Sequence, residues 1–400
     1  MSNVFVVSEY VDAEQNSTGF FWSRIIKRVG GEYGRVSVIY PEPAMLPAES
    51  VDATVNKLPF YAPRFNKNKL SARVFGQVCQ IVGFCWRIVR HVKKGDVVMT
   101  GTNPALLLMI LPLLKRLKGF KWGVLVHDVF PENLVPAGVI KSDGCLYPII
   151  KRLFSVVYDS ADLLIVIGRD MQELVAQKVR NPSKVVYVSN WADETEVYPL
   201  PRGEVPLIEK MGWQNKVVFQ FFGNIGRLQG IENILDAISL VGDGRAAFLF
   251  MGEGALVPKV QEFISAYPSR NVAYAGAVPL KDKNLGLAAG DVALISLENG
   301  MLGLGVPSKA YFSLAADKPL LAIMDERAEI SRVIRETGVG WQCGPSKPQD
   351  LADLIIEICA IDFAPLSGRS RSIFLKTYSE TPVLNKFIDS LTPLVELQKS

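Results

Sequence analysis

The sequence predicts an α/β protein made of two doubly wound, Rossmann-like domains that face each other across a central cleft. Its 400 residues exceed the roughly 250 to 300 at which a single hydrophobic core stops growing. Because 49% of the residues are hydrophobic and 21% are charged, the chain can fill two cores. Short, continuous apolar runs alternate with longer helical stretches, which is typical of parallel strands covered by helices on both faces.

Two sets of apolar runs define the expected strands. The first set is 4–7, 35–40, 96–101, 122–128, 162–168 and 185–190, and the second is 217–223, 246–252, 272–276, 291–296, 319–324 and 339–343. The stretch between them, 190–206, is polar and contains proline, as expected of a linker. We therefore expect one domain over 1–195, a second over 196–380, and a helix over 381–400 that packs back toward the first domain.

Cysteine usage and the apolar segments indicate a cytoplasmic protein. The five cysteines show neither metal-ligand spacing nor an obvious disulfide pattern, which favours a reducing compartment. The N-terminus has no basic region followed by an apolar core, so we expect no signal peptide. The most apolar window, 105–114, is shorter than the about 20 residues that cross a bilayer.

Positive charge is concentrated in the first half of the chain. Residues 1–196 hold about 24 Lys and Arg against about 18 Asp and Glu, and the rest holds about 20 against about 22. The basic segments 64–75, 87–96 and 115–122 also carry aromatic or long aliphatic residues. They fit either solvated helix faces or a surface that docks on anionic lipid. Nucleic acid is not expected, because the pI of about 8.6 is modest and no nucleic-acid module is present.

A glycine turn follows the first strand of the second set. Gly223 and Gly226 come directly after the apolar run, Arg227 follows, and helical spacing resumes at Ile231. Ligands of parallel sheets bind beyond the carboxyl ends of the strands, and a helix start with a nearby arginine favours phosphate. The same turn also fits simple helix–strand packing, so both interpretations stay open.

Two further loops of the second half are rich in glycine. Gly252, Glu253 and Gly254 follow the next strand, where glycine either admits a ligand or closes a tight turn. The loop 297–306 carries three glycines and leads into Ser308 and Lys309 before a helix. Such loops have a reason to be mobile or to lie close to a ligand.

The first half has two candidate loops of its own. Asn16, Ser17, Thr18 and Gly19 precede an apolar helix and could serve as a simple N-cap. His127, one of two histidines, ends a strand and is followed by Asp128 and, further on, Glu132. This polar cluster lies where the edge of a cleft is expected.

The order of these motifs resembles the family 4 glycosyltransferases of the GT-B fold over almost the whole chain. The resemblance is to the bacterial branch that builds O-antigen, capsule and colanic-acid-type polysaccharides and includes N-acetylfucosamine transferase-like proteins. The matching residues are Gly223, Asn224, Gly226, Gln229 and Gly230 in one turn, Asp128, Pro131 and Glu132 in a first-half loop, Asn190, Trp191 and Asp193 in a hinge, and Pro307, Ser308, Lys309 and Tyr311 before a helix.

The resemblance implies transfer of a sugar from a UDP- or GDP-sugar co-substrate, with retention of anomeric configuration and with no tightly bound cofactor or metal. It implies a polyprenyl-diphosphate-linked glycan acceptor and a peripheral enzyme on the inner face of the cytoplasmic membrane. The implied donor-binding residues are Gly223, Asn224, Gly226, Arg227, Gln229, Gly252, Glu253, Gly254, Glu298, Ser308 and Lys309; His127 and Asp128 take the catalytic positions, and Asn16, Ser17, Thr18, Gly19 and Glu132 line the acceptor side of the cleft.

The sequence departs from the wider family in three places. Leu304 and Phe312 stand where two glutamates are usual, Gln229-Gly230 replaces a lysine, and Asp317 replaces a glycine. Two alternatives stay open: a catalytically weak nucleotide-sugar-binding scaffold and a nucleotide-sugar 2-epimerase. A dinucleotide-dependent oxidoreductase is the least expected, because no G-x-G-x-x-G turn follows the first strand.

Overall fold

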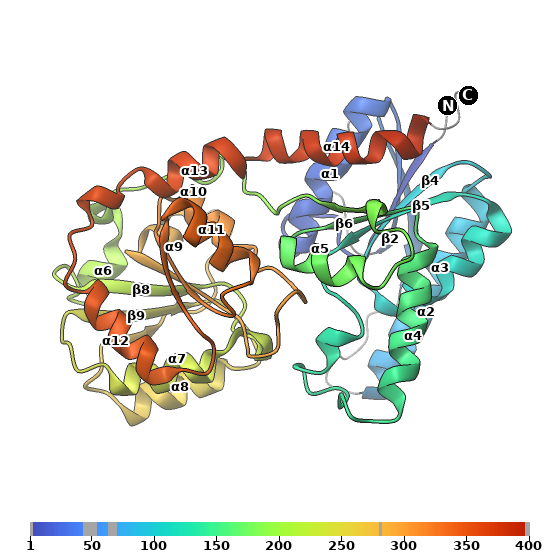
Figure 1. Ribbon diagram of the computed structural model, residues 1–400. Helices are drawn as coiled ribbons and strands as arrows, with labels where there is room; N and C mark the ends of the chain where they lie inside the picture. Colours follow the sequence, from blue (N-terminus) through green and yellow to red (C-terminus); the bar gives the residue numbers. More distant parts are fainter. Residues whose placement is uncertain (1–2, 43–53, 63–69, 280–281, 397–400) are drawn as a thin grey trace.

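The computed structural model describes residues 3–42, 54–62, 70–279 and 282–396. They form two parallel sheets, each wound with helices, so the predicted α/β fold class is confirmed (Figure 1). No helix of the described ranges is both long and apolar enough to cross a membrane. All five cysteines are free thiols.

The first half of the chain forms a seven-stranded sheet in the order β3-β2-β1-β4-β5-β6-β7. Its strands are β1 (Val4–Val7), β2 (Val36–Glu42), β3 (Val55–Tyr61), β4 (Val97–Gly101), β5 (Lys121–Val126), β6 (Leu163–Val166) and β7 (Val185–Tyr187). Its helices are α1 (Ser17–Tyr33), α2 (Leu70–His91), α3 (Ala105–Lys118), α4 (Leu146–Ser160) and α5 (Arg169–Ala176).

The second half forms a six-stranded sheet in the order β10-β9-β8-β11-β12-β13. Its strands are β8 (Val217–Phe222), β9 (Ala246–Met251), β10 (Val272–Tyr274), β11 (Val292–Ser296), β12 (Leu320–Ile323) and β13 (Gly340–Cys343). Its helices are α6 (Pro206–Lys210), α7 (Ile231–Leu240), α8 (Val257–Ala266), α9 (Lys283–Ala288), α10 (Lys309–Ala315), α11 (Glu329–Thr337), α12 (Pro348–Ile358) and α13 (Arg369–Thr377).

All twelve expected strands are present, and β3 is an additional one. It pairs in parallel with β2 at the edge of the sheet. Pro59 lies within it, and an edge strand tolerates proline because its missing N–H breaks no ladder bond on the open side. The strand mixes polar and half-buried residues, so it lacks the continuous apolar run from which the other strands were predicted.

Strand order places the predicted loops at one crevice in each half. In both sheets the order reverses between two neighbouring strands, β1 beside β4 and β8 beside β11. Ligands of open α/β sheets bind outside the carboxyl ends of the strands at such a switch point. The glycine turn after β8, the loop after β11 and the start of α1 all belong to these two crevices.

A C-terminal helix joins the two halves. α14 (Glu380–Glu396) follows the second half but packs against α1 and β6 of the first, and it crosses α1 in Figure 1. Just before it, Ser379 forms an isolated parallel bridge with Ala192 of the inter-sheet segment. Arg24 of α1 pairs with Asp193 at 3.0 Å and with Glu380 at 3.6 Å. The two segments that connect the halves, one near Asp193 and one near Glu380, therefore both contact α1 through Arg24.

A second contact between the halves is built from α5 and α11. The carboxylate of Glu329 is 1% exposed and pairs with Arg169 at 2.9 Å. It also accepts a hydrogen bond from the Tyr187 hydroxyl at 2.9 Å. Next to it, the carboxylate of Asp170 accepts the backbone N–H of Gly303 at 3.1 Å. This contact ties the glycine-rich loop after β11 to the first half.

Candidate active site

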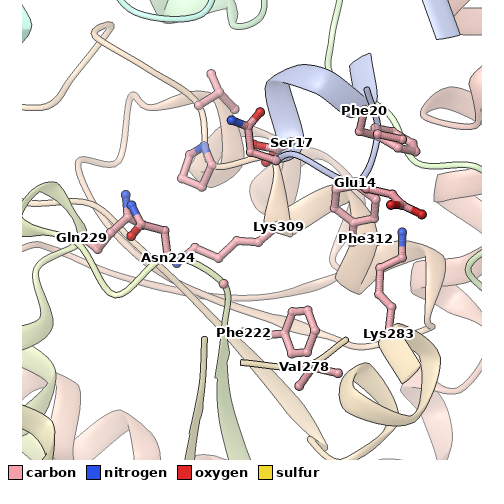
Figure 2. A pocket seen from close by; sticks show the side chains of 16 residues that line it. Glu14, Ser17, Phe20, Phe222, Asn224, Gln229, Val278, Lys283, Lys309 and Phe312 are labelled. Carbon is pink, nitrogen blue, oxygen red and sulfur yellow. The ribbon is translucent and has the colours of Figure 1, made fainter. Parts of the chain in front are cut away.

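Three adjoining cavities lie at the carboxyl ends of the strands, two of them lined by residues of both halves and one by residues of the second half alone. The largest, cavity 1 of about 600 Å³, is lined by Asn16 and Ser17 from the first half and by Gly223, Asn224 and Lys309 from the second, among others (Figure 2). Cavity 2, of about 570 Å³, shares the Gly223 turn with it. Cavity 3, of about 190 Å³, shares Ser17 with it. Together they form one trough between the halves.

Lys309 gives cavity 1 a cation without a counter-charge. Its ammonium is buried, and among the described residues it has no hydrogen-bond partner. The amine lies 3.4 Å from the centroid of the Phe221 ring, and in Figure 2 the side chain extends toward Asn224. Burial lowers the pKa of Lys309 well below its usual value. Protonation of a buried amine without a partner is unfavourable, so an anion in cavity 1 would offset that cost and favour the charged ammonium.

The two glycine turns of the second half pack directly on each other. A side chain at Gly252 would bring Cβ within 1.9 Å of the Gly223 carbonyl oxygen. The Ile225 N–H donates to the Glu253 carbonyl at 2.7 Å. Gly223, by contrast, has open space where its Cβ would lie. Thus Gly252 is required for packing, whereas Gly223 leaves its backbone open to the trough.

Cavity 2 is formed by the interlocked turns and the loop after β10. Gly252, Glu253 and Gly254 line it together with Ala277 and Val278. Backbone and small side chains dominate this wall, so a planar ring could approach the backbone closely. The resemblance implied that these three residues bind the donor, and the structure brings them next to the Gly223 turn.

Cavity 3 brings the predicted catalytic pair against the second half. His127 and Asp128 line it opposite Gln229 and Ser308, and Thr18 also belongs to its wall. The backbone N–H of Val129, next to this pair, donates to the Leu304 carbonyl at 3.1 Å. The two halves are thus in direct contact at the pair, as the strand-end positions of these residues predicted.

Burial shifts the pKa of both titratable groups of cavity 3 toward the uncharged form. Burial raises the pKa of Asp128 to about 6, against an opposing hydrogen bond with Asn103. Burial lowers the pKa of His127 to about 4. At neutral pH, therefore, His127 is an uncharged hydrogen-bonding group while Asp128 is mostly ionised. A carboxylate here can stabilise positive charge that develops on a reacting sugar.

Aromatic rings of the first half fix the position of His127. Its ring stacks on Phe21 of α1 with centroids 6.1 Å apart, and Phe21 meets Trp191 edge to face at 4.6 Å. The neighbouring Asn190 lines cavity 3, is 2% exposed, and has an amide oxygen without a hydrogen-bond partner in the described part of the chain. Its motif was assigned to a hinge, so the sequence analysis missed this cavity residue.

The far end of cavity 1 is aromatic and cationic. Phe312, where a glutamate is usual, packs edge to face on Phe20 of α1 with centroids 5.5 Å apart. The Lys283 ammonium lies 4.8 Å from the Phe312 centroid and points into this end of the cavity in Figure 2. No sequence motif marked Lys283, because it comes to line cavity 1 only through the packing of the two halves. The missing carboxylate is thus replaced by an aromatic contact across the cleft.

Five predicted residues lie outside these three cavities. Arg227 is exposed and belongs to a short 3-10 turn, Arg227–Gln229, that separates the glycine turn from α7. Glu298 turns back to accept the Asn299 N–H at 3.0 Å. Glu132 pairs with Lys178. Gly226 is buried beside Asn224, and Gly19 packs against the Asp12 carbonyl. Their proposed roles in binding stay predictions.

Asn16 both caps α1 and lines cavity 1. Its side chain accepts the Gly19 N–H at 2.9 Å. Within the described ranges, no group of three or more His, Cys, Asp and Glu side chains could hold a metal ion.

Comparison with known proteins connects this trough to a protein family. No protein-family model matches the chain. The chain is 53% identical over 399 residues to the Pseudomonas aeruginosa protein WbjE, named as a probable glycosyltransferase, with 100% of both chains covered. It is 22% identical over 235 residues to WcaI of Escherichia coli strain K12, named as a colanic acid biosynthesis glycosyl transferase, covering 58% of this chain and 57% of that one.

Solved structures show the same fold. Sucrose-phosphate synthase from Thermosynechococcus elongatus matches with a TM-score of 0.78 at 13% identity, covering 100% of both chains. Anabaena Alr3699/HepE in complex with UDP matches with a TM-score of 0.72 at 12% identity, covering 98% of this chain and 100% of that one. The chain therefore belongs to the glycosyltransferases of the GT-B fold, in the family of WbjE.

Proposed function

We propose that the chain transfers a sugar from a UDP- or GDP-sugar to a lipid-linked glycan acceptor during assembly of a surface polysaccharide such as O-antigen or capsule. The observation that carries this proposal is the buried, unpaired ammonium of Lys309 in cavity 1. Cavity 1 shares Gly223 with cavity 2, and it shares Ser17 and Gln229 with cavity 3, where Asp128 lies. A nucleoside, a diphosphate and a reacting sugar would occupy such a trough in that order.

The chemistry follows from this order. The reaction expels a nucleoside diphosphate, so negative charge grows where Lys309 and the open backbone at Gly223 can receive it. Positive charge develops on the sugar, next to Asp128. We propose retention of configuration, as in family 4 enzymes, with the acceptor attacking on the side of the leaving group. No protein nucleophile is then required.

Names of similar proteins support the substrate classes. A solved structure of HepE holds UDP-glucose, and WcaI is named for colanic acid biosynthesis. We propose a nucleotide-sugar co-substrate without a tightly bound cofactor, and an enzyme peripheral to the inner face of the cytoplasmic membrane. We retain 1–195 as the acceptor domain and 196–380 as the donor domain, with the helix of 381–400 packing back on the first.

Turnover with matched substrates tests this function. The full chain is incubated with a panel of UDP- and GDP-sugars, with and without a lipid-linked glycan fraction, while released nucleoside diphosphate and sugar in the lipid phase are measured. We expect release that depends on the acceptor and a product with the anomeric configuration of the donor. Binding without release would favour the scaffold, and isomerised nucleotide sugar without acceptor would favour the 2-epimerase.

A further inference from the structure

Helix α4 has two apolar faces, and only one of them is buried. Phe154, Val157 and Tyr158 face the core. On the other side Leu146, Ile149, Leu153 and Val156 recur at spacings of three and four residues, and between 51% and 62% of each is exposed. A surface helix of a globular protein carries one apolar stripe and a polar opposite face. The outer stripe of α4 is therefore unexplained by folding.

Helices α2 and α3 repeat this arrangement. Their inner faces are buried by residues such as Phe84 and Leu111. Their outer stripes, all exposed, are Phe75, Val78, Val82, Trp86 and Val89 on α2, and Leu106, Met109, Leu113 and Leu117 on α3. Single exposed apolar residues are ordinary, whereas rows on neighbouring helices mark an interaction surface.

The three outer stripes form one surface. α2 packs against α3, and α3 packs against α4. Figure 1 shows the three helices on the side of the seven-stranded sheet away from α1 and α14. We call this surface, made of the outer stripes of α2, α3 and α4, the α2–α4 face.

The charge of the α2–α4 face has a single sign. The three helices contain one carboxylate, Asp159, and it pairs with Arg180 and Lys184. The guanidinium groups of Arg87 and Arg90 lie 4.9 and 5.6 Å from the exposed ring of Trp86. The three helices and the residues just after α2 hold further cations: Lys93, Lys94, Arg116, Lys118, Lys151 and Arg152.

We propose that the α2–α4 face docks on an anionic lipid bilayer. Apolar side chains and an amphipathic aromatic ring enter the headgroup boundary, while the surrounding Lys and Arg attract anionic headgroups. The surface combines the two signals that stable peripheral attachment requires, buried apolar area and a basic rim. The basic segment 64–75 predicted from the sequence lies largely outside the residues whose side chains are described, and Phe75 is its one residue that belongs to the α2–α4 face.

A second copy of the chain fits the α2–α4 face less well than lipid. In a two-fold symmetric contact the same patch meets itself, so the cations of one copy, such as Arg90, Arg116 and Arg152, would be brought near the cations of the other. Like charges placed together across an interface are costly. Negative headgroups supply the missing counter-charge.

The α2–α4 face is connected to the active site through one segment. Residues 129–145 lead from Asp128 in cavity 3 to the start of α4, and Val139 within this segment is 65% exposed. If the acceptor is lipid-linked, as the proposed function holds, the bilayer that receives the α2–α4 face also holds the acceptor. This last step rests on the proposed function, whereas the docking itself does not.

Vesicle co-sedimentation of the full chain tests the proposal. The probes are vesicles of phosphatidylcholine alone and vesicles with phosphatidylglycerol added, at low and high salt. We expect binding to the anionic vesicles that weakens at high salt, because surface charges are then screened. Equal binding to both vesicles, or no binding at low salt, would overturn the proposal.

Two sets of substitutions locate the surface. L113E combined with I149E places charge in two exposed stripes, and K151E with R152E reverses the basic rim; each pair should weaken binding by at least about tenfold. The matched control, L240E with L375E, changes two exposed leucines of the second half and should leave vesicle binding unchanged. Equal losses in control and test variants would overturn the location.

Two further readouts separate this proposal from other outcomes. Sedimentation velocity compares the oligomeric state of the wild type with that of the L113E and I149E double variant, and we expect the same state for both. A wild-type dimer that dissociates in this variant would assign the surface to a second copy instead. Donor-induced thermal stabilisation should be the same in wild type and in all variants. If no donor binds while vesicle binding behaves as expected, the proposed function fails and the docking surface stands.

Discussion

The two halves of the molecule share one architecture and differ in their outer surfaces. In the second half the exposed large apolar residues are scattered over separate elements, as with Leu240, Tyr267 and Ile361. In the first half they line up on three neighbouring helices. Because the same wound parallel sheet supports both surfaces, the fold alone does not require the apolar face. Under the docking proposal, the difference reflects what each half binds.

The inner edges of the two halves differ as well. The first half brings the carboxyl of Asp128 and the neutral ring of His127 to the trough, and the second brings the ammonium of Lys309. One half thus supplies a group suited to positive charge, and the other a group suited to a diphosphate. Substitutions in each half should consequently break different steps.

The largest effect is expected from Asp128→Asn in the first half. It removes the charge with little change of shape, and we expect kcat to fall about 100-fold, or about 2.7 kcal/mol, with donor affinity preserved. Because burial raises the pKa of Asp128 to about 6, wild-type kcat/KM should rise with pH through about 6. The variant should lack this step in a pH–rate profile.

Asp143→Asn, an exposed change in the same segment, is the control and should keep the wild-type profile. The contribution of Asp128 to stability falls as pH rises through about 6, whereas its contribution to kcat/KM rises. A carboxyl with a raised pKa in the folded state stabilises the protein at low pH and loses that contribution as pH rises through about 6. A variant that lost activity through unfolding would show a lowered Tm above pH 6, which would contradict a role in turnover.

The next effect concerns the contact between the halves. Arg169→Met leaves the buried carboxylate of Glu329 with only the Tyr187 hydroxyl and a backbone N–H. We expect a loss of about 2 kcal/mol in urea unfolding, less than for a fully buried pair because Arg169 is partly exposed. Arg327→Met, which breaks an exposed pair with Asp325, should have little effect. If both variants lost the same free energy of unfolding, the pair of Arg169 and Glu329 would contribute no more than an exposed surface pair.

A gain in stability is expected from Lys309→Met in the second half. Removing a buried, unpaired ammonium should stabilise the ligand-free protein by about 1–2 kcal/mol at neutral pH. Because the pKa of Lys309 is lowered from 10.5, the folded state binds fewer protons than the unfolded state between its lowered pKa and 10.5, so wild-type stability rises with pH across that window.

The gain from Lys309→Met should therefore shrink as pH approaches 10.5, which urea unfolding at several pH values measures. Lys347→Met, at a lysine that is 61% exposed, should not follow this dependence. A destabilised Lys309→Met protein would mean that the ammonium has a partner in the ligand-free state.

The smallest effect belongs to Asp317, which replaces a glycine. It adopts a left-handed backbone with φ of 56°, and its carboxylate accepts the N–H groups of Gly368 at 2.6 Å and Arg371 at 2.9 Å. The substitution therefore caps α13. Asp317→Ala should cost about 1 kcal/mol in thermal unfolding, and Asp317→Gly should cost less because glycine adopts this backbone freely. The reverse order would contradict the capping role.

Strand pattern predicted most of the fold, and strand ends predicted much of the candidate site. His127, Asp128, Gly223 and Lys309 lie in different parts of the sequence, yet each follows a strand whose carboxyl end opens on the same trough. The rule that ligands bind there was sufficient to group them. Strand β3 was missed because an edge strand with proline has no continuous apolar run.

What the sequence did not reveal depends on contacts between distant segments. Lys283 and Asn190 reach the trough only because the halves meet. The sequence also did not reveal the 3-10 turn that leaves Arg227 exposed, and its expected contact with phosphate stays a prediction. Likewise, the apolar composition of α2, α3 and α4 could not tell which of their two faces would be covered, since burial is decided by the tertiary fold.

We propose that the second half binds a nucleoside diphosphate through Lys309, while the first half binds the acceptor and docks on the membrane. Isothermal titration of UDP and GDP into wild type, Lys309→Met and Asp128→Asn tests it most directly. We predict binding of one nucleotide that is unchanged in Asp128→Asn and weakened by about 100-fold in Lys309→Met, as for loss of a charged hydrogen bond. Equal affinity in wild type and Lys309→Met, or binding lost in Asp128→Asn alone, would contradict this division between the halves.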